Sequence, residues 1–215
     1  MRAKVAVATV QGKAYFLIVN ELKQRDIPFL SLIPGDSVPV QVKAVITTEK
    51  EKHLTKHNKI LVYDTKSEPE ILGIKVLKIL QGKEDYDHVV IGVDPGEVFG
   101  LAVVADGAVI DTENCFSIEE TLNKVKSVLK TVNFSRTAIT IKIGNGVPIF
   151  RKLLEAFDEA LPHQVSLEIV GEAGTNRYTR EIKNRRGLRH MASAMRIARR
   201  PGYVYSRRKK LEQDS

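Results

Sequence analysis

The chain has 215 residues, 43% of them hydrophobic and 28% charged, which is typical of a globular protein and excludes a mainly disordered one. Its length favours two domains, and its apolar runs are too short to cross a bilayer, so we expect no membrane partner. The single cysteine, Cys115, excludes an internal disulfide and a cysteine-based zinc site. The first residues lead directly into a strand-like run without the features of a signal peptide, which predicts a cytoplasmic protein.

Positive charge is concentrated near the C-terminus. The net charge of the chain is +8, but residues 177–210 hold thirteen Lys or Arg and one acid, Glu181. That segment therefore carries +12 and the rest of the chain −4. A surface that binds a polyanion needs such an asymmetry, because each phosphate that a cation neutralises releases counterions. The distribution predicts a nucleic-acid partner, DNA or RNA; the alternative is a basic tail that only aids solubility.

The first 84 residues alternate between strand and helix patterns. Short β-branched runs predict strands, while an apolar stripe after Gly12 and another after Pro69 predict helices. The predicted strands are 5–10, 29–33, 42–47 and 60–63, the predicted helices are 12–26 and 69–80, and 49–57 is predicted to be a short helix or loop. This order predicts a small three-layer, Rossmann-like α/β domain over residues 1–84, with a charged linker at 83–88. No glycine-rich phosphate motif is present, so we assign this domain no ligand.

The second half opens with three strands joined by tight turns. They are predicted over 89–93, 99–104 and from 108 onward, with the hairpin signal Asp106-Gly107 before the third. Helices at 117–132, 148–161 and 186–199 then alternate with strands at 137–143 and 165–170. Ser117 and Glu120 form a capping-box pattern. The order predicts a mixed sheet with helices on its faces over residues 89–206, and a basic flexible tail over 207–215.

An aspartate follows the first of these strands. The apolar run 89–93 delivers Asp94 to the edge of the sheet, and Pro95 and Gly96 end the strand and turn the chain beside the carboxylate. An aspartate that only caps its own turn is the alternative.

Residues 89 to about 200 resemble the RNase H-like superfamily. The resemblance rests on the aspartate motif, VIGVDPG at 90–96, and on the strand order. They look similar to its RuvC and YqgF branches, including archaeal proteins with a RuvC-like module. The resemblance implies an RNase H-like domain and a metal-dependent phosphodiester hydrolase acting on structured DNA or RNA. Asp94 matches the family's metal-binding aspartate, Glu172 stands where its later acid lies, and His190 occupies the first acidic position of its last helix. These three would be the catalytic residues and the ligands of Mg²⁺ or Mn²⁺.

Two positions depart from the family pattern. The strand ending at Ile143 is followed by Gly144-Asn145-Gly146 without an acid, and Ser193 replaces the second acid of the last helix. A smaller carboxylate set leaves open a non-catalytic nucleic-acid-binding protein with a degenerate nuclease site. A phosphotransferase of the actin-like fold is a third reading, which the short chain disfavours.

The basic stretch leads into the helix that carries His190. It would bring cations to the edge of the sheet where Asp94 lies, and its tyrosine would offer a face on which a base can stack. The predicted nucleic-acid-binding residues are Tyr178, Arg180, Arg185, Arg186, Arg189 and Arg196. The sequence leaves the oligomeric state open, with a homodimer among the options.

Overall fold

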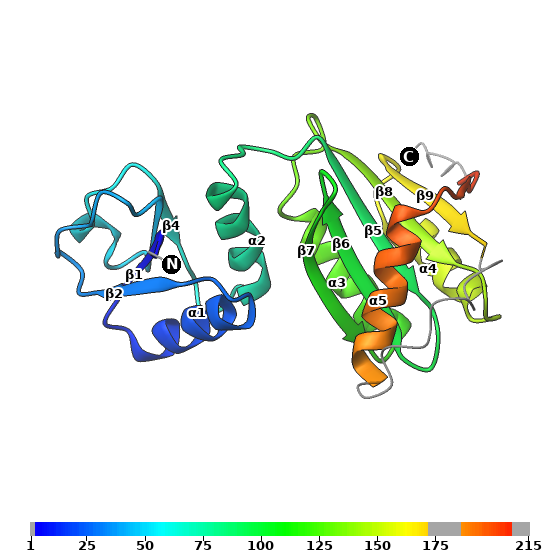
Figure 1. Ribbon diagram of the computed structural model, residues 1–215, viewed down its shortest axis with the longest axis horizontal. Coiled ribbons are helices and arrows are strands. Elements are labelled where there is room, and N and C mark those ends of the chain that lie inside the picture. Colours follow the sequence, from blue (N-terminus) through cyan, green and yellow to red (C-terminus); the bar gives the residue numbers. More distant parts are fainter. Residues whose placement is uncertain (1–2, 172–185, 208–215) are drawn as a thin grey trace, which may run out of the picture. The chain divides into compact units, whose positions relative to one another are not determined.

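The computed structural model describes residues 3–171 and 186–207. The chain divides into two compact units, residues 1–84 and 85–215, each of which is described by itself (Figure 1). Both units are α/β, as predicted from the sequence. None of the helices in the described ranges has the length and apolar character needed to span a membrane.

The N-terminal unit is a parallel sheet of four strands in the order β2-β1-β3-β4. The β-branched and small residues of β1 and β3 are buried throughout, which places these two strands at the centre of the sheet. The elements are β1 (Val5–Ala8), α1 (Gly12–Gln24), β2 (Phe29–Leu32), β3 (Ala44–Thr47), the 3₁₀ helix η1 (Lys52–Leu54), β4 (Ile60–Val62) and α2 (Pro69–Leu80).

Both helices of this unit cover the same face of the sheet. Leu22 of α1 and Val76 of α2 share one core cluster with Val7 of β1. On the opposite face, Ala6 packs with Val42 from the coil between β2 and β3. The third layer of the predicted three-layer domain is therefore a coil, because the connection from β2 to β3 contains no helix.

The C-terminal unit is a mixed sheet of six strands in the order β10-β9-β8-β5-β6-β7. The meander β5-β6-β7 is antiparallel, while β5, β8 and β9 run parallel to one another. The elements are β5 (His88–Asp94), β6 (Phe99–Ala105), β7 (Ala108–Cys115), α3 (Ile118–Leu129), β8 (Ala138–Gly144), α4 (Phe150–Ala160), β9 (Val165–Val170), α5 (Arg186–Arg199) and β10 (Tyr203–Val204).

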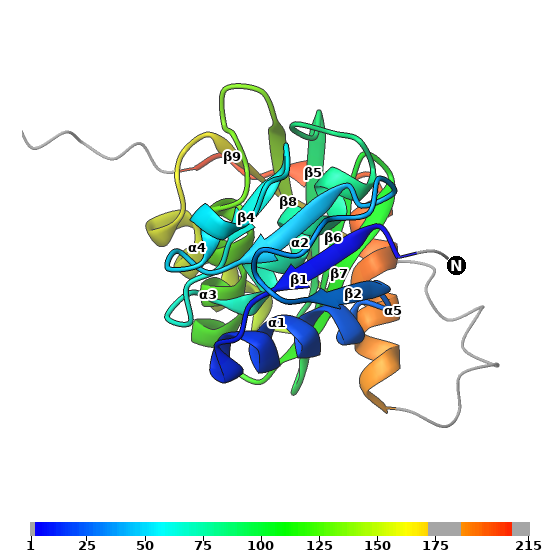
Figure 2. The ribbon, with the colours of Figure 1, turned by 90° about the vertical axis from the view of Figure 1, so that its left-hand side faces the viewer.

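Helices lie on both faces of this second sheet. Figures 1 and 2 show α3 and α4 on one face and α5 on the other. The start of α3 follows the predicted capping box: Glu120 N donates to Ser117 Oγ (3.0 Å), and the Glu120 carboxylate accepts from Phe116 N (2.6 Å). The elements follow the order β-β-β-α-β-α-β-α that the sequence predicts, and the short strand β10 comes after α5.

Arg207 differs from the prediction of a flexible tail that begins there. Its guanidinium is buried beside Asp158 of α4 and donates to the Asp158 carboxylate at 2.9 Å. The same side chain donates to the main-chain carbonyls of Asp158, Leu161 and Pro162, at 2.6, 2.8 and 2.6 Å. A charge that is fully hydrogen-bonded in this way fixes the chain after β10 against α4. The sequence predicts a solvated side chain at this position because a run of like charges is usually exposed to water.

Candidate functional site

Asp94 ends β5, a central strand of the six-stranded sheet. Because β5, β8 and β9 are parallel, their carboxyl ends meet at one edge of the sheet, where open α/β sheets usually bind ligands. The backbone N–H of Asn145, just after β8, donates to the carbonyl of Val170 at 3.1 Å and ties two of these strand ends together. Asp94 is half-buried at this edge.

Two glycines allow α5 to lie directly on the sheet. A Cβ at Gly92 would stand 2.7 Å from the backbone nitrogen of Ala198 and closer still to the carbonyl oxygen of Ala194. A Cβ at Gly100, which pairs with Asp94 across β5 and β6, would collide with the backbone of His190. Since alternate residues of a strand share a face, Gly92 and Asp94 both point toward α5. The glycines thus bring the helix close to the aspartate.

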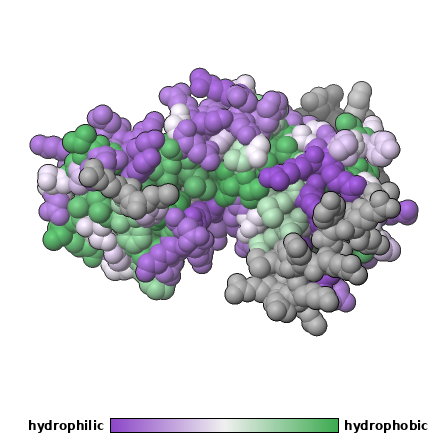
Figure 3. Space-filling view, viewed as in Figure 1, coloured by the Kyte–Doolittle hydropathy of each residue, from purple (hydrophilic) through white to green (hydrophobic). Residues whose placement is uncertain are grey.

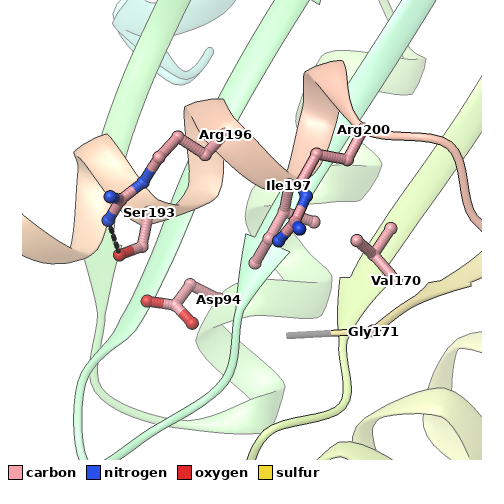
Figure 4. A pocket seen from close by; sticks show the side chains of 7 residues that line it. All are labelled: Asp94, Val170, Gly171, Ser193, Arg196, Ile197 and Arg200. Carbon is pink, nitrogen blue, oxygen red and sulfur yellow. Dashed lines mark hydrogen bonds between the residues drawn. The ribbon is translucent and has the colours of Figure 1, made fainter. Parts of the chain in front are cut away.

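A pocket of about 150 Å³ lies between α5 and the ends of β5 and β9. Figure 4 shows the carboxylate of Asp94 facing the side of α5 that carries Ser193. Arg196 Nη2 donates to Ser193 Oγ at 2.9 Å, and Arg200 reaches toward the end of β9. An apolar cavity of that size holds a benzene-sized molecule, so a ribose or a phosphate is of suitable size. The lining residues are Asp94, Val170, Gly171, Ser193, Arg196, Ile197 and Arg200.

The charges around this pocket are mostly positive. Among its lining residues two guanidinium groups accompany one carboxylate. Lys142 of β8 donates to the main-chain carbonyl of Arg200 (2.6 Å) and forms an ion pair with Glu168 of β9 (3.4 Å). A cation at the C-terminus of a helix complements the helix dipole, so Lys142 stabilises the last turn of α5. The backbone that carries Arg200 is therefore held in place.

The described part of the pocket does not fit a two-metal centre. Across residues 3–171 and the described part of 186–207, no three His, Cys, Asp or Glu side chains lie close enough to hold an ion. Asp94 is the one carboxylate among the described residues that line the pocket, and the guanidinium groups beside it repel a cation. A pair of divalent ions needs several oxygen ligands.

The structure brings only some of the predicted site residues together. Asp94 and Arg196 meet in the pocket. His190 lies one turn of α5 before Ser193, over Gly100, but does not line the pocket. Arg189 is exposed next to it. Glu172, Tyr178, Arg180 and Arg185 lie outside the described residues, as does the side chain of Arg186.

Two further residues of this region were not predicted from the sequence. Arg200 lines the pocket, and Tyr203 on the edge strand β10 is 80% exposed. Helical spacing offered a signal for Arg200. It follows Ser193 and Arg196 at the steps of three and four residues that bring side chains to one face of a helix. A strand of two residues leaves no comparable pattern.

A separate polar cluster lies in the N-terminal unit, where β1 and β3 end. The Glu51 carboxylate accepts hydrogen bonds from Thr9 Oγ1 (2.5 Å), Thr48 Oγ1 (2.6 Å) and Val10 N (2.9 Å). Burial raises the pKa of Glu51, but the bonds from Thr48, Thr9 and Val10 together lower it below its usual value. These bonds satisfy the carboxylate within the protein, so the cluster supports the fold.

The N-terminal unit is similar to a known protein family. Residues 4–72, about a third of the chain, match the model of a family described as a response regulator receiver-like domain. The strand order 2-1-3-4 of the N-terminal unit agrees with the flavodoxin-like order that receiver domains share. No curated protein matches the chain.

One solved structure with weak similarity is the Argonaute of Marinitoga piezophila in complex with a 5′ OH guide RNA. The sequences are 11% identical, the match covers 79% of this chain and 39% of that chain, and the TM-score is 0.26. The chain therefore spans about two fifths of the length of that protein. A TM-score of this size carries no inference about function.

Proposed function

We propose that the C-terminal domain binds nucleic acid at the carboxyl edge of its sheet, with α5 as the main contact element. The observation that carries this proposal is the pocket beside Asp94, which is lined by Arg196 of α5 and by Arg200, the residue that follows this helix. Guanidinium groups hold phosphate by paired hydrogen bonds, and phosphate contacts supply most of the affinity of proteins for nucleic acid.

The surface around the pocket supports this function. Arg189, Arg196 and Arg199 are exposed, and the sequence of α5 contains no acid. In the space-filling view, hydrophilic residues gather over the C-terminal part of this helix (Figure 3). Tyr203 follows the helix closely and exposes its ring, so it offers a face on which a base can stack.

Binding without cleavage is the form of this function that the geometry favours. Metal-dependent hydrolysis would require Asp94, Glu172 and His190 to converge on Mg²⁺ or Mn²⁺. Of these three, the described part of the pocket lining contains Asp94 alone, next to two arginines. The cations instead suit an anionic ligand.

The test is salt-dependent binding of a fluorescently labelled single strand, followed by anisotropy. The logarithm of the affinity should fall with the logarithm of the salt concentration, and Arg196→Gln or Arg200→Gln should lower that slope by about 0.7 for each phosphate that the protein no longer neutralises. The matched control is Arg151→Gln, which removes the same charge from an exposed position on α4, across the sheet. Binding that ignores salt, or an equal loss of affinity in all three variants, would refute the proposal.

A further inference from the structure

We infer that the pocket beside Asp94 selects RNA over DNA, with the carboxylate accepting a hydrogen bond from a ribose 2′-hydroxyl while Arg196 and Arg200 hold the adjacent phosphate. This inference rests on the proposed function and names its substrate class. It starts from an apparent conflict: a carboxylate lies in a pocket whose other charges attract phosphate.

An ionised carboxylate accepts hydrogen bonds and donates none. The backbone of a DNA strand offers Asp94 no donor, because its phosphate and sugar oxygens only accept. It would therefore bring one more negative charge against the aspartate, at a cost in binding. An RNA backbone carries one donor per nucleotide, the 2′-hydroxyl, by which proteins distinguish RNA from DNA. The 2′-hydroxyl of RNA can therefore donate a hydrogen bond to the Asp94 carboxylate, which offsets the repulsion between this carboxylate and the phosphates.

The positions of the groups suit recognition of both features of one nucleotide. The 2′-hydroxyl and the 3′-phosphate are attached to neighbouring carbons of one ribose, so an acceptor and a cation are needed side by side. The carboxylate of Asp94 lies below α5, and Arg196 and Arg200 line the same pocket, one toward each end (Figure 4). A carboxylate has about four lone-pair sites, so it accepts the hydroxyl while keeping its contacts within the protein.

The parts of this pocket are held rigidly enough to discriminate. Asp94 belongs to a strand paired on both sides, by β6 and β8. Arg196 is bonded to Ser193, and the Lys142 ammonium fixes the carbonyl of Arg200. Because the strand and the backbone that carry these groups are held in place, less of the binding energy is lost in arranging them. Hydrogen bonds to charged groups are the stronger ones, so we expect a preference of about tenfold.

The experiment compares three labelled single strands of one sequence built from A, C and G: RNA, DNA and 2′-O-methyl RNA. All binding is measured in EDTA, so that no metal bridges the strand and the protein. The unaltered protein should bind RNA about tenfold more tightly than either of the other strands. Asp94→Ala should bring the three affinities within about twofold, because it removes the acceptor for the 2′-hydroxyl together with the charge that repels the phosphates of every strand. The control Glu155→Gln, an exposed acid on α4, should keep the full preference.

The outcomes separate this inference from the proposed function. Failure of every strand to bind with a salt dependence overturns both. Equal binding of the three strands, still weakened by Arg196→Gln, overturns the selection of RNA alone. Tight binding of 2′-O-methyl RNA would also overturn it, because the methyl ether has no proton to donate. If Asp94→Ala instead abolishes binding of RNA and DNA alike, the carboxylate has another role and the inference falls.

Discussion

The position of α5 depends on the absence of a side chain at Gly92, which makes Gly92→Ala the most informative single change. The new Cβ would stand 2.7 Å from the backbone nitrogen of Ala198, where carbon atoms need about 3.5 Å or more. The helix would have to retreat by about 1 Å, loosening the buried packing of Ala194 and Ile197. Overpacking of a core costs about 1–3 kcal/mol, and we expect the upper end because helix backbone cannot swing aside as a side chain can.

Urea unfolding followed by circular dichroism measures this cost, and strand binding measures its effect on the pocket. Gly92→Ala should lower the unfolding free energy by about 3 kcal/mol and weaken the binding of RNA, because Arg196 and Arg200 move with the helix. Gly171→Ala is the control for stability: a Cβ there has no atom of the described residues within 4 Å, so the change should stay within about 0.5 kcal/mol. Unchanged stability of Gly92→Ala would refute the packing argument, and reduced stability with full affinity would refute the link between helix and site.

Three further changes test the packing of the C-terminal domain by urea unfolding. Arg207→Gln should cost about 3–5 kcal/mol because it leaves the buried Asp158 carboxylate without its cation, whereas Arg136→Gln, at an exposed ion pair, should cost less than about 1 kcal/mol; similar costs would contradict this. Ser117→Ala should cost about 1 kcal/mol through removal of the helix cap, and an unchanged stability would show that the cap is dispensable. Burial, and to a lesser extent the charge of a nearby glutamate, raises the pKa of the Cys115 thiol from 9.0 to about 11, so its contribution to stability is full below pH 9 and is lost as the pH rises toward 11. Cys115→Ala should flatten that alkaline decline in stability, and an unchanged pH profile would argue against it.

The fold was largely predictable because hydrophobic periodicity changes clearly along this chain. The alternation of strand and helix in the first half and the meander at 88–115 both have strong local signals, in apolar runs and in turns such as Asp106-Gly107. Elements that depend on distant partners were missed. β10 exists because Tyr203 and Val204 pair with β9, and Arg207 is buried because Asp158 lies opposite it.

The position of Asp94 at the edge of the sheet was predictable, but the residues of α5 that face it were not. The strand end and the Pro95-Gly96 turn place Asp94 at the sheet edge, and the basic stretch indicates a cationic helix. The close approach of α5 over Gly92 and Gly100 determines which turn of that helix faces the aspartate. No local sequence pattern predicts that approach. The sequence reading therefore paired Asp94 with His190, whereas Ser193 and Arg196 line its pocket.

The charge of the side chains that face Asp94 distinguishes a metal ligand from a residue of an anion-binding pocket. The sheet fixes the carboxylate whatever the domain does, because its position follows from the end of β5. Carboxylates on the facing helix would favour a divalent cation at this place, whereas Arg196 and Arg200 favour an anion, as the proposed nucleic-acid site requires. Under that proposal Asp94 accepts a hydrogen bond from the ligand in addition to the contacts that it makes within the protein.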